Sequence, residues 1–143
     1  MRFLLPVLLL LGWQETSVAR GRYFQQECDM EIQVRLDDHV HRLFGFEKMH
    51  YVNHSPDTLH FIYMHAWPNA YKNDRSRFCE QEVENGNTTF YYSREEDRGF
   101  MDSLQFQYGN QVLAMHLVED QDDMLEVELP KALLPGEAID IST

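Results

Sequence analysis

Residues 51–71 read YVNHSPDTLHFIYMHAWPNAY, and this stretch predicts a strand, a tight turn, a second strand and an abrupt end. Pro56 fixes φ at the second position of a turn, and the Asn and Asp around it are residue types that hydrogen bond to the nearby backbone. Residues 59–65 are rich in aromatic and β-branched side chains, which is typical of a strand. Pro68 has no N–H to donate to a ladder, so this strand should end just before it.

The chain on either side continues the pattern of strands and turns. Residues 30–36 alternate apolar and polar side chains, which predicts a strand with one buried face. Residues 41–52 should pair with it as an antiparallel hairpin, with Gly45 marking a bulge or a close backbone approach. Further strands are predicted over residues 88–92, 100–108, 112–118, 125–129 (ending at Pro130) and 138–141. The regular spacing of strands predicts an all-β fold, an antiparallel β-sandwich.

Residues 72–99 are the least regular part of the chain. Asp74 or Ser76 could cap a short helix over residues 77–84, which Gly86 would help to end. A long segment without a clear period in a compact domain often carries function or faces a partner.

The first residues are typical of a secretory signal peptide. Arg2 precedes an apolar run over residues 3–11, and small residues fit cleavage after Ala19. The run is shorter than the roughly 20 residues that a spanning helix needs, and an uncleaved anchor is the alternative. The sequence therefore predicts export to the periplasm or extracellular space. It also predicts three segments: a signal peptide over 1–19, a lead-in over 20–29 and one β-sandwich domain over 30–143.

The charge of the chain argues against two classes of partner. The 143 residues carry a formal net charge of −12. Phosphate backbones and anionic membrane surfaces repel such a chain, so we expect no nucleic acid partner and no membrane partner after signal cleavage. The acidity also fits the simpler need of an exported protein to stay soluble.

The residues that could carry metal or redox chemistry form no strong motif. Cys28 and Cys79 could form a disulfide in an oxidising compartment, although their spacing does not fix whether they meet. His60 and His65 are five residues apart, so on one strand they point to opposite faces. The sequence contains no H-E-x-x-H, the helical motif of many zinc peptidases. We therefore assign no catalytic or metal-binding residue.

Aromatic side chains supply the candidate interface. Those nearest the irregular segment are Trp67, Tyr71, Phe90, Tyr91 and Tyr92. Core or interface packing is the common role of such residues in a sandwich, and a recognition patch is the alternative.

The pattern Tyr51-x-Asn53-x-Ser55-Pro56-Asp57-Thr58-Leu59, followed by Tyr63-x-His65-x-Trp67-Pro68-Asn69-Ala70-Tyr71, resembles a known family. It is similar to the N-terminal β domain of bacterial exported zinc aminopeptidases of the aminopeptidase N type, which are gluzincin metallopeptidases. Other pieces agree in order: Ile32-x-Val34-x-Leu36-Asp37, Leu43-x-Gly45, Glu95-Glu96-Asp97-Arg98-Gly99, Met101-Asp102-Ser103-Leu104 and Leu133-Leu134-Pro135-Gly136-Glu137.

The resemblance implies a saddle-like β domain that performs no chemistry itself. In that family zinc is held on a separate helical domain by H-E-x-x-H and a downstream Glu, and a G-x-M-E-N segment binds the substrate amino terminus. None of these motifs occurs here, so no cofactor is expected in this chain. The resemblance further implies an incomplete N-terminal domain or fragment that scaffolds a peptide-binding cleft, with a catalytic domain or another protein as partner. The alternative is a stand-alone exported β-sandwich module that binds through its aromatic patch.

Overall fold

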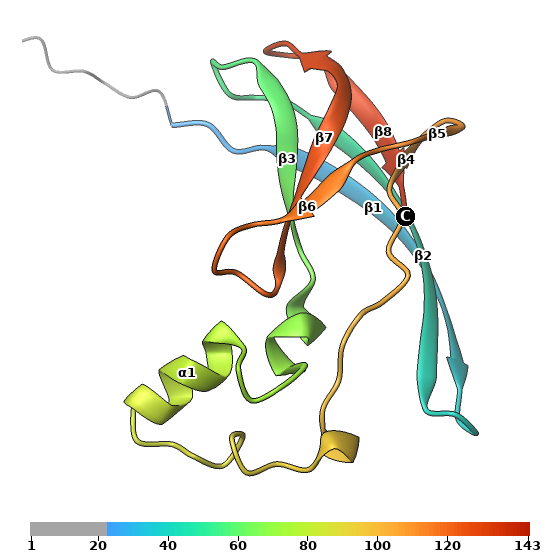
Figure 1. Ribbon diagram of the computed structural model, residues 1–143. Coiled ribbons are helices and arrows are strands. Elements are labelled where there is room, and N and C mark those ends of the chain that lie inside the picture. Colours follow the sequence, from blue (N-terminus) through green and yellow to red (C-terminus); the bar gives the residue numbers. More distant parts are fainter. Residues whose placement is uncertain (1–22) are drawn as a thin grey trace, which may run out of the picture.

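The computed structural model describes residues 23–143, so the predicted signal peptide lies outside the described residues. Over residues 23–143 the fold is mostly β, with two antiparallel sheets and one α-helix, and this confirms the predicted all-β, sandwich-like class. One sheet has the strand order β1-β2-β8-β4-β5 and the other β3-β7-β6 (Figure 1).

The first two strands form a long hairpin. β1 spans Glu27–Asp37 and β2 spans Arg42–Val52, and all eleven residues of each strand are paired. The register runs without interruption through Val34 and Gly45, and no atom lies within 4 Å of where a Cβ on Gly45 would be. The bulge or close approach predicted at Gly45 was therefore wrong. β1 also begins three residues before the end of the predicted lead-in, because its pairing with β2 starts at Glu27.

Only the near part of this hairpin is joined to the rest of the sheet. β8, which spans Ala138–Ser142, pairs with β2 over residues 48–52. Thr143 adds one more pair, exchanging N–H···O bonds of 2.7 and 2.9 Å with Glu47. Beyond this point β1 and β2 project as a two-stranded ribbon (Figure 1). We call residues 30–46 the ribbon, which includes this projection and the adjoining residues of β1.

The second sheet lies over the near part of the hairpin. β3 spans Leu59–His65, β7 spans Met124–Leu133 and β6 spans Met115–Leu117. β7 continues through Pro130, so the predicted end of the strand there was wrong. The register between β3 and β7 shifts between Leu59 and Phe61, which are paired with Leu133 and Glu128. This irregularity in the ladder accommodates a residue that cannot donate a hydrogen bond.

The chain changes sheets between β5 and β6. β4 spans Gln107–Tyr108 and β5 spans Gln111–Val112, both in the first sheet, and the Gly-Asn turn predicted between them is confirmed. The Leu113 N–H donates to Phe106 O at 2.8 Å, whereas Ala114 O accepts from Glu128 N of the second sheet at 3.0 Å. The single strands predicted over 100–108 and 112–118 were therefore wrong in extent.

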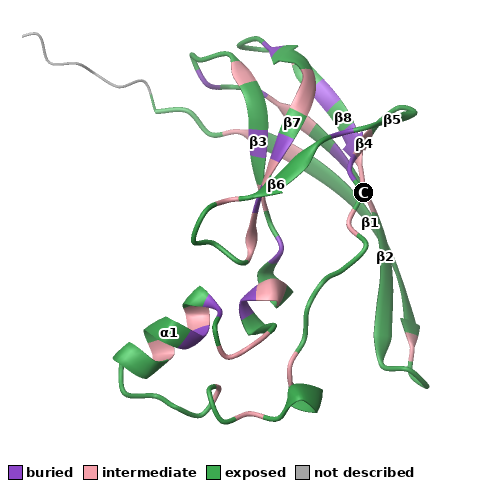
Figure 2. Cartoon of the chain, in the orientation of Figure 1, coloured by how far each residue is buried: buried purple, intermediate pink, exposed green. Residues whose placement is uncertain are grey.

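The core lies between the sheets, near the attached part of the hairpin. Its side chains come from both sheets and the sheet-changing segment: Met49, Ile62, Ala66, Phe106, Leu113, Leu125, Val127, Leu133, Ile139 and Ile141. Figure 2 shows the buried residues concentrated on β3, β7 and β8. The residues of this core and the strands that carry them form the body of the protein.

An irregular arm connects β3 to β4. It contains the 3-10 helix η1 (Trp67–Tyr71), α1 (Arg77–Glu84) and the 3-10 helix η2 (Glu95–Asp97). The predicted helix and its cap are confirmed: buried Ser76 accepts a hydrogen bond from Cys79 N, and Gly86 has φ of 83° at the end of the helix. The strand predicted over 88–92 is instead a turn, closed by a 3.2 Å bond from Tyr92 N to Thr88 O.

Candidate interaction surfaces

The conspicuous polar motif at residues 53–57 is a structural corner. The Asn53 amide group is buried, and it donates to Asp57 O at 2.8 Å and to Leu133 O at 3.0 Å. Its Oδ1 accepts from the backbone N–H and the hydroxyl of Ser55 at 3.0 and 2.7 Å. These bonds join the end of β2 to the end of β7. The polar atoms of Asn53 and Ser55 are therefore engaged in the fold itself.

The ribbon exposes an apolar face. Met49 is only 3% exposed, but the apolar residues that follow it on the same face become steadily more open. This apolar ribbon face consists of Met30 (55% exposed), Ile32 (58%), Val34 (60%), Leu36 (64%) and Leu43 (69%). The strand was predicted correctly, but its buried face was wrong, because the second sheet does not extend over this end of the hairpin. Figure 2 shows most of the ribbon as exposed.

The opposite face of the ribbon is mixed. Glu31, Gln33 and Arg35 lie on it, across from Lys48, Phe46 and Phe44 of β2. The Arg35 guanidinium stacks over the Phe44 ring at 4.3 Å, which is a cation–π contact. The ribbon is thus amphipathic, with charged and aromatic side chains on one face and, on the other, aliphatic side chains together with Glu47 of β2, which lies opposite Ile32.

An aromatic cluster organises the arm. The rings of Tyr71, Phe78 and Phe90 meet with centroid distances of 4.7, 5.5 and 5.8 Å. Arg98 lies over Phe90 at 5.5 Å and donates to the Ser93 and Tyr91 carbonyls at 2.9 and 3.2 Å. The sequence placed Tyr71 and Phe90 in one candidate interface. Phe78 was not included, although its place two residues after the helix cap is the signal that could have found it.

The other members of the predicted interface lie apart from this cluster. Trp67 is 64% exposed and stacks on His65 at 4.9 Å, at the start of the arm. Tyr91 and Tyr92 form their own edge-to-face pair at 5.0 Å, and Tyr92 is 77% exposed. The five predicted residues therefore form three small aromatic groups along one arm, of which the cluster around Phe90 is the most buried.

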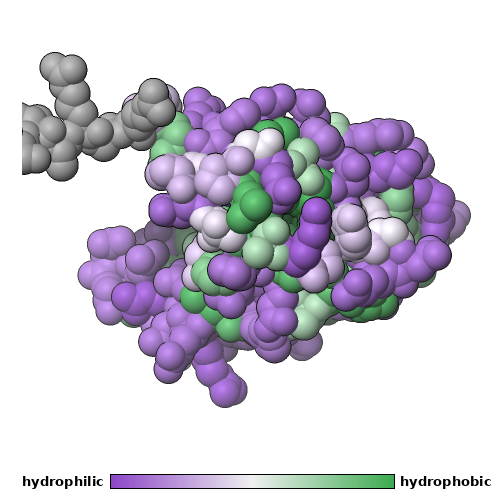
Figure 3. Space-filling view, turned by 90° about the horizontal axis from the view of Figure 1, so that it is seen from above, coloured by the Kyte–Doolittle hydropathy of each residue, from purple (hydrophilic) through white to green (hydrophobic). Residues whose placement is uncertain are grey.

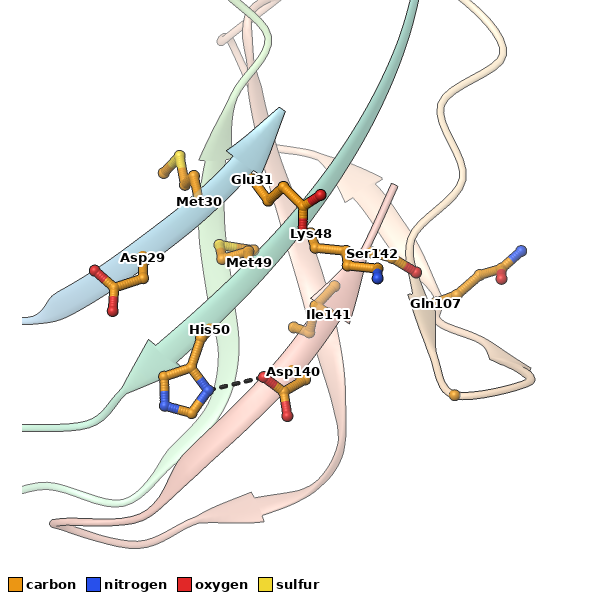
Figure 4. Close-up of a pocket in the computed structure, with 11 residues that line it drawn as sticks. Asp29, Met30, Glu31, Lys48, Met49, His50, Gln107, Asp140, Ile141 and Ser142 are labelled. Carbon is orange, nitrogen blue, oxygen red and sulfur yellow. Dashed lines mark hydrogen bonds and ion pairs between the residues drawn. The ribbon is translucent and has the colours of Figure 1, made fainter. Parts of the chain in front are cut away.

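A shallow hollow of about 550 Å³ crosses the polar face of the first sheet. Figure 4 shows its side chains on β1, β2 and β8: Asp29, Glu31, Lys48, His50, Asp140 and Ser142. His50 Nδ1 lies 2.8 Å from Asp140 Oδ1, and this hydrogen bond is the main cause that raises the pKa of His50. The hollow holds carboxylates, the Lys48 ammonium group and one ion-paired histidine, and within residues 23–143 no hydrogen bond joins its Ser142 hydroxyl to a base.

Neither cysteine forms the disulfide that the sequence left open. Cys28 on β1 packs beside the core, and Cys79 is fully buried in α1, and both are free thiols. Burial raises the pKa of each thiol, so both are protonated at neutral pH.

Within residues 23–143, no group of three or more His, Cys, Asp or Glu side chains converges in a metal-binding arrangement. The same part of the chain forms no helix long and apolar enough to cross a bilayer. Seen from above, apolar patches lie between hydrophilic side chains on this face of the molecule (Figure 3). Comparisons with family models, with curated proteins and with solved structures find no match to this chain.

Proposed function

We propose that this chain is a non-catalytic N-terminal β domain of an exported zinc metallopeptidase similar to aminopeptidase N. Its task is to pack against a catalytic domain and to form part of the wall of a peptide-binding cleft. The observation that carries the proposal is the apolar ribbon face, which continues the core face of the sheet with nothing among residues 23–143 to cover it.

The energetics of this face favour a covering partner. Five aliphatic side chains on it are each more than half exposed. At 25 cal/mol per Å², covering them contributes about 1 kcal/mol for each side chain. Contiguous exposed apolar surface of this kind marks protein interaction sites on soluble proteins.

The residues that carry the family resemblance have structural roles that suit such a domain. Asn53 and Ser55 join β2 to β7, and Trp67 and Pro68 begin the arm after β3. Residues that form corners and end strands are the ones a scaffolding domain requires. Their roles support a relationship to the N-terminal domain of that family, and they assign no step of the peptidase reaction to this chain.

A binding experiment with a matched pair of variants tests the proposal. The probe is the purified helical catalytic domain of a bacterial aminopeptidase N-type enzyme, titrated calorimetrically into this chain. Ile32→Lys puts a charge into the apolar ribbon face, whereas Gln33→Lys adds the same charge to the opposite face. We expect Ile32→Lys to weaken binding at least tenfold and Gln33→Lys to leave it nearly unchanged.

Footprinting and activity measurements complete this test. Met30 should become protected from hydroxyl-radical oxidation when the catalytic domain is added. The chain alone should bind no stoichiometric zinc and release no product from an aminoacyl anilide in zinc-replete buffer. Absence of binding, or a zinc-dependent activity of this chain, would contradict the proposal.

The second candidate is a stand-alone exported binding module, favoured by the exposure of Trp67 and Tyr92 on the arm. The two functions differ in which surface a partner covers. Protection that falls on residues 67–71 and 90–92 and spares Met30 would select the module. In that case Tyr92→Ala, and not Ile32→Lys, would weaken binding.

A further inference from the structure

The outer edge of β1 offers unpaired backbone groups. Glu47 exchanges both of its hydrogen bonds with Thr143, so its N–H and C=O point away from β1. Backbone groups alternate in direction along a strand, and therefore Phe46 and Lys48 point toward β1, where they pair with Gln33 and Glu31. The alternate residues of β1 must direct their N–H and C=O outward. Along residues 30–36 these are Met30, Ile32, Val34 and Leu36, and β1 is the edge strand of its sheet.

This edge carries charged side chains, but it lacks three other features that protect edge strands: shortness, proline and a bulge. It is eleven residues long, contains no proline and has no bulge in its register with β2. The residues with outward-pointing backbone groups are also the apolar ones, each more than half exposed. Such an edge is a template for another strand. A strand that matches it needs apolar residues at alternate positions.

We propose that a second copy of this chain pairs with β1 along this edge, antiparallel, with the two-fold axis at Gln33. The register then places Ile32 opposite Val34 of the second copy, and Met30 opposite Leu36. All four residues with free backbone groups meet apolar residues of the same kind. The first sheets of the two copies would join into one, and the bodies would lie at opposite ends of the paired ribbons.

Charge complementarity selects this register. With the axis at Gln33, Glu31 of each copy lies directly across from Arg35 of the other copy. Because the hydrogen-bonded pairs fall on even residues, these two lie in non-hydrogen-bonded pairs, where side chains approach most closely. Within residues 23–143 neither Glu31 nor Arg35 has an ion-pair partner.

Two features oppose the pairing and bound its strength. The register places Asp29 opposite Asp37, so two negative charges face each other. The Asp37 charge is partly balanced because its Oδ1 accepts from the backbone N–H groups of His39 and Val40. The net charge of −12 also repels the two copies. Moving the axis by one residue, to Ile32, would place Leu36 opposite Cys28 and remove the Glu31–Arg35 pairs.

Sedimentation velocity of charge-swapped variants tests the pairing, which is independent of the proposed function. Glu31→Arg and Arg35→Glu each create like-charge pairs across the axis, so each should raise the dimer dissociation constant about tenfold. The double variant restores opposite charges and should return association to the original level. Glu31→Arg makes the chain less acidic, so general charge repulsion predicts the opposite effect. A monomeric protein, or single variants that associate normally, would overturn the proposal.

Cysteine cross-linking tests the register directly. Residue 33 lies on the axis, where facing Cα atoms are about 4.5 Å apart, which suits a disulfide. Gln33→Cys should therefore oxidise rapidly to a covalent dimer. Glu31→Cys and Arg35→Cys should each cross-link poorly alone and well when mixed. A dimer packed through the apolar ribbon face would leave Gln33→Cys uncrosslinked and would refute edge pairing.

Discussion

The two ends of the β1–β2 hairpin have similar sequence patterns and opposite environments. Near the body, Met49 lies under the second sheet and is almost completely buried. On the ribbon, Leu43 lies on the same face of the same strand and is mostly exposed. The alternation of side chains fixes which residues share a face, but only a second layer makes that face a core. The body is thus a completed sandwich, and the ribbon is a sheet with one layer.

The largest expected effect comes from truncating matched leucines at the two ends. Leu133 is fully buried in the body, so Leu133→Ala should lower the free energy of unfolding by about 3 kcal/mol. Leu36 lies on the ribbon, and Leu36→Ala should change the free energy of unfolding by less than about 0.5 kcal/mol. Urea unfolding of both variants measures the contrast. Equal losses would mean that the ribbon face is covered in solution.

The polar corner of the body gives the next effect. Asn53→Ala removes the donor to the Asp57 and Leu133 carbonyls and the acceptor for Ser55. Leaving these groups unpaired should cost about 2 kcal/mol of unfolding free energy. The exposed neighbour His54 provides the control, and His54→Ala should have little effect in the same urea titration. A loss of unfolding free energy close to zero in Asn53→Ala would show that water molecules replace the hydrogen bonds of Asn53.

A smaller effect is expected at the arm. Ser76 Oγ donates to Ala70 O at 2.5 Å and accepts from Cys79 N, so it links η1 to the start of α1. Ser76→Ala should cost about 1 kcal/mol. Amide hydrogen exchange should report this loss mainly in residues 77–84. Ser93→Ala, elsewhere on the arm, serves as comparison, and faster exchange throughout the body would contradict a local role for Ser76.

The smallest effect concerns pH at the junction of β2 and β8. Hydrogen bonding to Asp140 raises the pKa of His50 in the folded protein above its ordinary value of 6.5. The folded state therefore binds the proton more tightly, and the pair stabilises the protein below the unfolded pKa. This contribution is lost as the pH rises through the folded pKa. The difference in urea midpoint between the wild type and His50→Gln should shrink from pH 5 to pH 8. A difference that stays constant with pH would contradict the stabilising role of the His50–Asp140 pair.

The strands themselves could be predicted from the sequence because their signals are local. The alternation over residues 30–36, the turn before β3 and the Ser76 cap each depend on a few neighbouring residues. Their environments depend on distant parts of the chain. Nothing in the pattern of Ile32 or Val34 distinguishes a covered strand from a bare one.

The errors in the prediction share this origin. Pro130 stays within β7 because the partner strand β3 shifts its register nearby. The strand predicted over 112–118 is divided because consecutive residues bond to different sheets. For the candidate interface, position in the sequence grouped Tyr71 and Phe90 because both flank the irregular segment, and their rings contact each other in the structure. Position in the sequence could not reveal that Trp67 and Tyr92 stack with other neighbours.

The change of sheets at Leu113 and Ala114 has a mechanical consequence. One peptide bond joins a residue held to Phe106, next to β4 of the first sheet, to a residue held by Glu128 of the second. Sliding one layer of the body past the other must therefore stretch this connection or break one of the two hydrogen bonds. The layers resist shear through the covalent chain as well as through their packing, and we expect both sheets to be lost together when the body unfolds.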